Sequence, residues 1–214
     1  MSALPQPKPY LTPEEYLTLE RQAETKSEYW QGETYALAGA STKHTIIGAN
    51  TLAELVMQLK GRPYTAHTND LRIKVARADH YSYPDVAVVC GQAEFEDPSE
   101  DTLLNPTVLI EVLSPSTEAY DRGAKFEFYR MLESLSDYLL ISQSRPIIEH
   151  YTRQLDDHWL LSTYKGLEAV AAIPSIGCEL RLVDVYDKVT WPAEELRPQS
   201  IRVVKEPGES YTTP

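Results

Sequence analysis

The sequence predicts a mixed fold of the α/β or α+β type, in which helices pack on a central mixed β-sheet. Helix-like stretches stand at 41–59 and 117–133. Short apolar segments typical of buried strands lie between them and after the second one, most clearly at 108–113. A chain of 214 residues is long enough to bury a sizeable core, so we expect one layered domain.

The expected domain covers residues 11–190 and is flanked by two segments of looser composition. Residues 1–10 contain three prolines and few apolar side chains, which is typical of a flexible N-terminal arm. Residues 191–214 are rich in Pro, Glu and Arg and are predicted to form a C-terminal tail.

A short helix and a hairpin are expected as an N-terminal extension. Thr12 can cap a helix that has Pro13 as its first residue and runs to about Arg21. Segment 28–37 is expected to form two short strands that turn at Gly32.

The first long helix is predicted from Ser41 to Leu59, with Gly61 as its C-terminal cap. Its expected apolar stripe consists of Ile46, Ala49, Leu52, Ala53, Val56 and Leu59. The other side is expected to carry His44, Thr51, Glu54 and Gln58.

Further strands are expected at 64–67, 71–75, 81–90, 137–142, 147–153 and 158–163, and a last short helix at 182–189. Because proline cannot donate a ladder hydrogen bond, the strand at 81–90 should begin near Pro84 or be unpaired there. The acidic segment 91–105 is expected to be a surface loop.

Two of the predicted strands carry a single acid in an otherwise apolar run, Asp85 in one and Glu111 in the other. Burying an ionised carboxylate is costly unless it is paired or binds a metal. If the strands are neighbours and both acids share a face, the carboxylates converge. At about 4 Å they would repel by roughly 4 kcal/mol at an effective dielectric constant near 20. A shared proton, a basic side chain or a divalent cation would relieve that repulsion.

Lys125 is the candidate base, since its helix starts just after the Glu111 strand and can fold back over the strand end. Mg²⁺, or Mn²⁺, is the candidate cation, because one or two carboxylates plus waters suit a hard ion. Such a site could hydrolyse a phosphodiester, with the lysine orienting water or stabilising developing charge. Structural alternatives stay open. Lys125 could have no role beyond a helical ion pair with Asp121, four residues earlier, and Asp85 could be a turn residue at the start of its strand.

The charge and composition restrict the partners. A net charge of −12 opposes broad electrostatic binding of nucleic acid, although a local basic groove is compatible with it. Cys90 and Cys178 lack a zinc-ligand spacing. With no signal peptide and no apolar run of membrane-spanning length, the chain is expected to be cytoplasmic and to have no membrane partner.

Three segments carry a family resemblance: YPDVAVV, NPTVLIEVLSPSTEAYDRGAKFEFYR and DYLLI. They resemble the Uma-type family of "putative restriction endonucleases", common in cyanobacteria, which is a branch of the PD-(D/E)XK nuclease superfamily. The resemblance runs from about Leu11 to Lys188 and includes LTPEEYL and PSIGCEL. It implies a restriction-endonuclease-like central sheet flanked by helices, and DNA as the substrate.

The resemblance also implies metal ligands. Asp85 matches the aspartate of the Pro-Asp motif, and Glu111 matches the acid of the (D/E)XK motif. The lysine of that motif should follow the acid by two residues, where this chain has Leu113. Lys125, on the following helix, is the implied replacement.

Many superfamily members take a further acid from the first core helix. His44 or Glu54 could take that place here, and His44 is preferred, while Asp121 is expected to orient Lys125. The expected catalytic set is therefore Asp85, Glu111, Lys125 and His44.

The leading functional hypothesis is a Mg²⁺-dependent DNA endonuclease. A non-catalytic binding protein with a nuclease fold is the alternative that the net acidity and Leu113 favour. A carboxylate-pair hydrolase, such as a glycosidase, would use Asp85 and Glu111 without metal. Because a double-strand cut by one site per chain requires two chains, a homodimer is expected.

Overall fold

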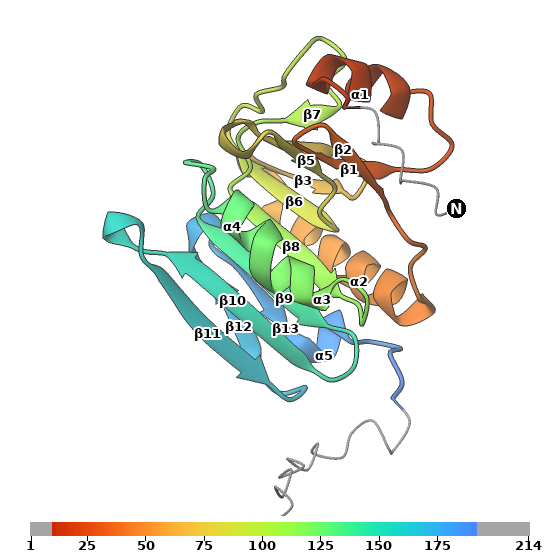
Figure 1. The fold of residues 1–214 in the computed structure, drawn as a ribbon. Coiled ribbons are helices and arrows are strands. Elements are labelled where there is room, and N and C mark those ends of the chain that lie inside the picture. The colour runs from red at the N-terminus through yellow and green to blue at the C-terminus, as the bar shows by residue number, and fades with distance from the viewer. Residues whose placement is uncertain (1–9, 192–214) are drawn as a thin grey trace, which may run out of the picture.

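Residues 10–191 of the chain are described by a computed structural model of the protein (Figure 1). They form a six-stranded sheet, a five-stranded sheet and a two-stranded hairpin, with helices packed against them. This architecture confirms the predicted mixed α+β class. The predicted arm and tail lie outside the described residues, apart from Tyr10 and Trp191.

The six-stranded sheet is the centre of the molecule and has the strand order β11-β10-β9-β8-β6-β3. Its strands are β3 (Tyr64–Thr68), β6 (Val86–Cys90), β8 (Val108–Leu113), β9 (Asp137–Ser142), β10 (Ile147–Arg153) and β11 (Trp159–Lys165). β8 and β9 run parallel, and every other neighbouring pair is antiparallel. The strand that contains Glu111 therefore lies in the interior of the sheet.

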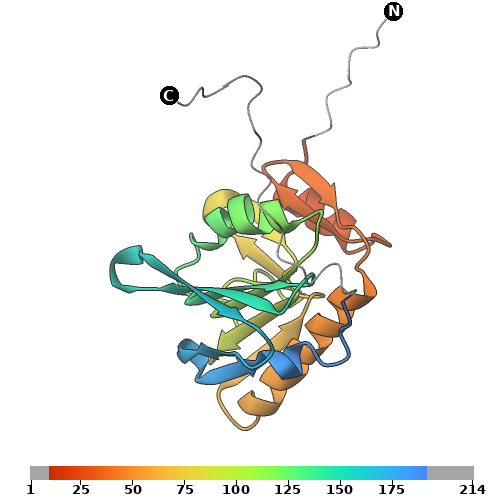
Figure 2. The same cartoon turned by 90° about the horizontal axis from the view of Figure 1, so that it is seen from below.

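Helices cover both faces of this sheet (Figure 2). One face packs against α2 (Thr42–Leu59), the hairpin of β12 (Val170–Ile173) and β13 (Cys178–Arg181), and α5 (Leu182–Val185). The connection between β8 and β9 covers the other face and consists of α3 (Glu118–Tyr120), a π-helical turn (Asp121–Lys125) and α4 (Phe126–Tyr129).

The alternation of side chains along β8 decides where its acid points. Ile110 and Val112 belong to the core beside α2, whereas Leu109 and Leu113 belong to the core under the β8–β9 connection. Because successive strand residues face opposite sides, Glu111 points toward the connection that carries Lys125.

The five-stranded sheet lies beside the central one and has the order β2-β1-β5-β4-β7. Its strands are β1 (Ser27–Trp30), β2 (Glu33–Ala36), β4 (Arg72–Val75), β5 (His80–Ser82) and β7 (Thr102–Leu103). Helix α1 (Pro13–Glu20) starts with the predicted Thr12 cap and stacks Tyr16 on Tyr29 at 5.0 Å between ring centroids. Short 3₁₀ turns at Ala76–Ala78, Leu155–Asp157 and Pro174–Ile176 complete the described elements.

The segment predicted as one strand at 81–90 forms two strands, and the predicted interruption near Pro84 is confirmed. The strand is interrupted at residues 83–85, so that β5 belongs to the five-stranded sheet and β6 belongs to the central one. Pro84 lies in this interruption, because proline has no N–H to donate to a neighbouring strand. The predicted loop 91–105 also differs, because it contains β7 with the buried residues Thr102 and Leu103.

The long helix forms as predicted, but its buried face is displaced from the expected stripe. The buried residues are Ile47, Thr51, Leu55 and Leu59. Val56 is 50% exposed although it was expected in the core. Adjacent apolar pairs such as Ile46-Ile47 allow two alternative stripes, and packing against β8 and the β12–β13 hairpin selects one of them.

Two helix boundaries and one hairpin also differ from the prediction. The helix expected at 117–133 ends at Tyr129, and the one expected at 182–189 ends at Val185. The β12–β13 hairpin was not predicted at all.

Candidate active site

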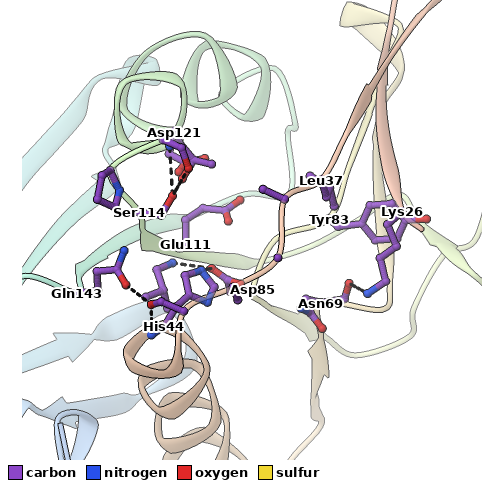
Figure 3. A pocket seen from close by; sticks show the side chains of 18 of the residues that line it. Lys26, Leu37, His44, Asn69, Tyr83, Asp85, Glu111, Ser114, Asp121 and Gln143 are labelled. Atoms are coloured by element: carbon purple, nitrogen blue, oxygen red, sulfur yellow. Dashed lines mark hydrogen bonds and ion pairs between the residues drawn. The ribbon is translucent and has the colours of Figure 1, made fainter. Parts of the chain in front are cut away.

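All four predicted catalytic residues line one pocket of about 640 Å³, at the junction of the two large sheets (Figure 3). Residues 24–26 and 37–41 form one wall, and the loop 114–117 forms another. Asp121 also lines the pocket, whereas Glu54 does not. Side chains separated by up to about 80 residues along the chain therefore meet at one place, as the sequence predicted.

The two strand acids are brought together by the pairing of β6 with β8. Val86 pairs with Ile110 in antiparallel register, so Asp85, the residue before β6, falls opposite Glu111. The backbone N–H of Val112 donates a hydrogen bond of 2.7 Å to Asp85 Oδ2. This bond holds the Asp85 carboxylate at the end of β6, where Pro84 interrupts the strand.

Glu111 is 4% exposed and has two polar partners. Its Oε1 lies 2.9 Å from Lys125 Nζ and accepts a hydrogen bond of 3.1 Å from the Tyr129 hydroxyl. Burial raises the pKa of Glu111 well above its ordinary value, and the charges of Asp121 and Asp85 add to this effect while Lys125 opposes it.

Lys125 is held by more than the helical pair with Asp121. Its Nζ lies 2.9 Å from Glu111, 2.9 Å from Glu28 and 3.7 Å from Asp121. Burial lowers the pKa of Lys125, but the surrounding acids, together with Tyr129, outweigh burial and raise this pKa well above its ordinary value. Lys125 ends a π-helical turn, a feature that is frequent at functional sites.

Glu28 was not predicted to be part of this group. It lies on β1, is 4% exposed and reaches Lys125 from the five-stranded sheet. The only signal in the sequence is an acid within the strand-like segment 28–30. Its approach to Lys125 depends on the pairing of β1 with β5, a contact between segments that local patterns do not reveal.

His44 lies in the first turn of α2, and its Nε2 is 3.2 Å from Asp85 Oδ2. Burial lowers the pKa of His44, but the hydrogen bond to Asp85 and its charge outweigh burial, so the net pKa is raised. His44 therefore contacts an acid of the site, consistent with its preference over Glu54.

The described site has an excess of acids. Asp85, Glu111, Asp121 and Glu28 gather around one lysine and one histidine. Burial, opposed by Lys125, raises the pKa of Asp121 too. Among residues 10–191, no group of three or more His, Cys, Asp or Glu side chains has an arrangement that could hold a metal ion by itself. Asp85 and Glu111, which line one pocket, are nevertheless a donor set that suits Mg²⁺, because this ion binds one or two carboxylates and keeps several waters.

Comparisons with known proteins identify the family. A family model described as "Uma2: Putative restriction endonuclease" matches residues 13–183. The chain belongs to the Uma2 family. This result confirms the resemblance carried by the segments around Asp85 and Glu111.

Two relatives of this Uma2 protein come from Synechocystis sp. (strain ATCC 27184 / PCC 6803 / Kazusa). "Uncharacterized protein sll1609" is 40% identical over 159 residues, which cover 74% of this chain and 90% of the relative. "Uncharacterized protein slr1290" is 36% identical over 180 residues, which cover 84% of this chain and 93% of the relative.

A solved structure shares the fold. It is the crystal structure of "a putative nuclease belonging to DUF820" from Anabaena variabilis ATCC 29413. It matches with a TM-score of 0.67 and 22% identity, over 83% of this chain and 98% of the other. The Uma2 protein therefore has a nuclease-like fold. None of the helices described in residues 10–191 has the length and apolar character needed to cross a membrane.

Proposed function

We propose that this Uma2 protein is a metal-dependent endonuclease that hydrolyses phosphodiester bonds of DNA. The observation that supports this most strongly is the meeting of Asp85 and Glu111 in one pocket, with Lys125 bound directly to Glu111. The excess of acids there creates a need for positive charge that a divalent cation would meet.

In this proposal Asp85 and Glu111 hold Mg²⁺, with Mn²⁺ as a substitute. When bound, the ion would polarise a phosphoryl oxygen and lower the pKa of a water. Lys125, as an ammonium group, would orient the attacking water and stabilise negative charge on the phosphoryl oxygens. His44 would hold the Asp85 carboxylate in place, together with the Val112 N–H.

The position of Lys125 answers one argument for the non-catalytic alternative. Leu113, which occupies the usual lysine position, is buried in the core under the β8–β9 connection. Lys125 reaches the Glu111 carboxylate from that connection instead. The missing lysine at position 113 is therefore no reason to expect an inactive protein.

The activity test compares the wild type with Asp85→Asn and Glu111→Gln on single-stranded and duplex DNA, with Mg²⁺, with Mn²⁺ and with EDTA. We expect cleavage by the wild type only with metal, and a loss of at least about 10²-fold in each variant, the scale of a lost charge-stabilising group. Glu127→Gln is the matched control, because Glu127 is exposed on the helix that follows Lys125. Full activity in either site variant would refute the assignment.

Metal binding is tested separately by thermal unfolding. A ligand that binds only the folded state stabilises it, by about 2.7 kcal/mol at a concentration of 100 Kd. We expect millimolar Mg²⁺ or Mn²⁺ to raise the Tm of the wild type and not that of Glu111→Gln. An unchanged Tm in the wild type would count against the metal site.

A further inference from the structure

We propose that Glu28 is a positioning residue for Lys125, so that the five-stranded sheet contributes to the active site. This inference rests on the proposed nuclease function and adds one residue to it. Glu28 lies outside the lining of the pocket, whereas Lys125 and Glu111 both line it. Glu28 would therefore act through the lysine, without contact with substrate.

The lysine is shared between two acids from different sheets. Its Nζ is 2.9 Å from Glu28 on β1 and 2.9 Å from Glu111 on β8. A cation bound by Glu111 would compete with the lysine for that carboxylate. Glu28 then provides an anionic partner that keeps the ammonium group beside the site.

Two further side chains, Tyr120 and His80, lie near Glu28. Burial raises the pKa of the Tyr120 hydroxyl, and the charge of the nearby Glu28 carboxylate adds to this effect. His80 Nε2 lies 3.0 Å from the same hydroxyl, within hydrogen-bond distance. Tyr120 and His80 thus lie near the carboxylate that pairs with Lys125.

The experiment measures DNA cleavage and Mn²⁺ affinity for Glu28→Gln, which keeps the shape and removes the charge. Residues that support metal ligands typically change metal affinity or activity by about 10–100-fold. We expect kcat to fall and the Kd for Mn²⁺ to rise, each by about tenfold, while KM for DNA stays unchanged. Glu28→Asp should recover part of kcat, because it restores the charge.

Glu33→Gln is the matched control, since it changes the same side chain at an exposed position of the partner strand β2. Assays are run well below the unfolding midpoint of every variant. If Glu28→Gln does not fold, Glu28→Asp replaces it, and because the shorter side chain moves the carboxylate away from Lys125, a smaller loss of kcat in the same direction is expected.

The outcomes separate this inference from the proposed function. Wild-type kcat and wild-type Mn²⁺ affinity in Glu28→Gln would overturn the role of Glu28 and leave the nuclease intact. If the wild type cleaves no DNA, the nuclease fails, and the Mn²⁺ affinities still decide the role of Glu28. A wild type that binds no Mn²⁺ overturns both.

Discussion

At the scale of single residues, the pocket depends on buried ionisable groups whose partners come from distant segments. Glu111, Asp121 and Lys125 are each at most 4% exposed. Removing one partner of such a group leaves an uncompensated buried charge, which typically costs about 3–5 kcal/mol. Glu111→Gln removes the charge but keeps the size of the side chain, so it tests the chemistry better than a truncation to alanine, which also leaves a cavity.

His80 gives a prediction for stability against pH. Burial lowers the pKa of His80 to about 4, while Lys125 adds to the effect and Glu28 opposes it. Between pH 6.5 and 4 the unfolded chain binds a proton at this histidine that the folded protein does not, so stability falls as the pH falls. The difference between 6.5 and about 4 corresponds to about 3 kcal/mol.

Urea denaturation at pH 7 and pH 4 measures this contribution. We expect the loss of unfolding free energy on acidification to be smaller in His80→Gln than in the wild type. His158→Gln serves as the control, because His158 is exposed. Equal losses in the wild type and His80→Gln would contradict the prediction.

At the scale of elements, much of the fold and most of the site followed from local patterns. β9 and β10 formed over the predicted residues, and Asp85, Glu111, Lys125 and His44 met as expected. What local patterns missed depends on contacts between distant segments. The break at Pro84 sends β5 to a different sheet, and only that sheet brings Glu28 to Lys125.

The π-helical turn gives a prediction at this scale. Deleting Gly123 would restore an α-helical turn and rotate the residues on one side of it by about 100° relative to those on the other. We expect Lys125 to lose its ion pair with Glu111 and the cleavage activity to fall to that of Lys125→Met.

Gly123→Ala is the control for that deletion. An added Cβ at Gly123 would meet no atom within 4 Å outside the backbone of its own helical segment, so alanine should keep the activity and raise stability by about 0.5–1 kcal/mol. Both changes are followed by urea denaturation and DNA cleavage. Activity retained in the deletion would show that the turn is not needed to place Lys125.

At the scale of the whole molecule, the central sheet ends in a strand suited to pairing with a second copy. β11 pairs only with β10 among residues 10–191, and it exposes Leu160 and Leu161 to 55% and 47%. A long edge strand with exposed apolar side chains favours association with another strand. Two copies joined there would supply the two sites that a double-strand cut needs.

Sedimentation velocity tests this assembly. We expect the wild type to sediment as a dimer and Leu161→Lys as a monomer, because a charge on the edge strand opposes pairing. Glu179→Lys, an exposed change on β13, is the control and should remain dimeric. A wild type that is monomeric at working concentrations would exclude the dimer.

The pocket also determines when activity can arise during synthesis. Domains generally fold as units while the ribosome adds about 5–20 residues per second. Glu28 leaves the ribosome early, but Lys125 follows 97 residues later, and β8 acquires its parallel partner only when residue 142 has been added. A nascent chain released before that point has no complete site, so under the proposed function prematurely terminated products should cleave no DNA.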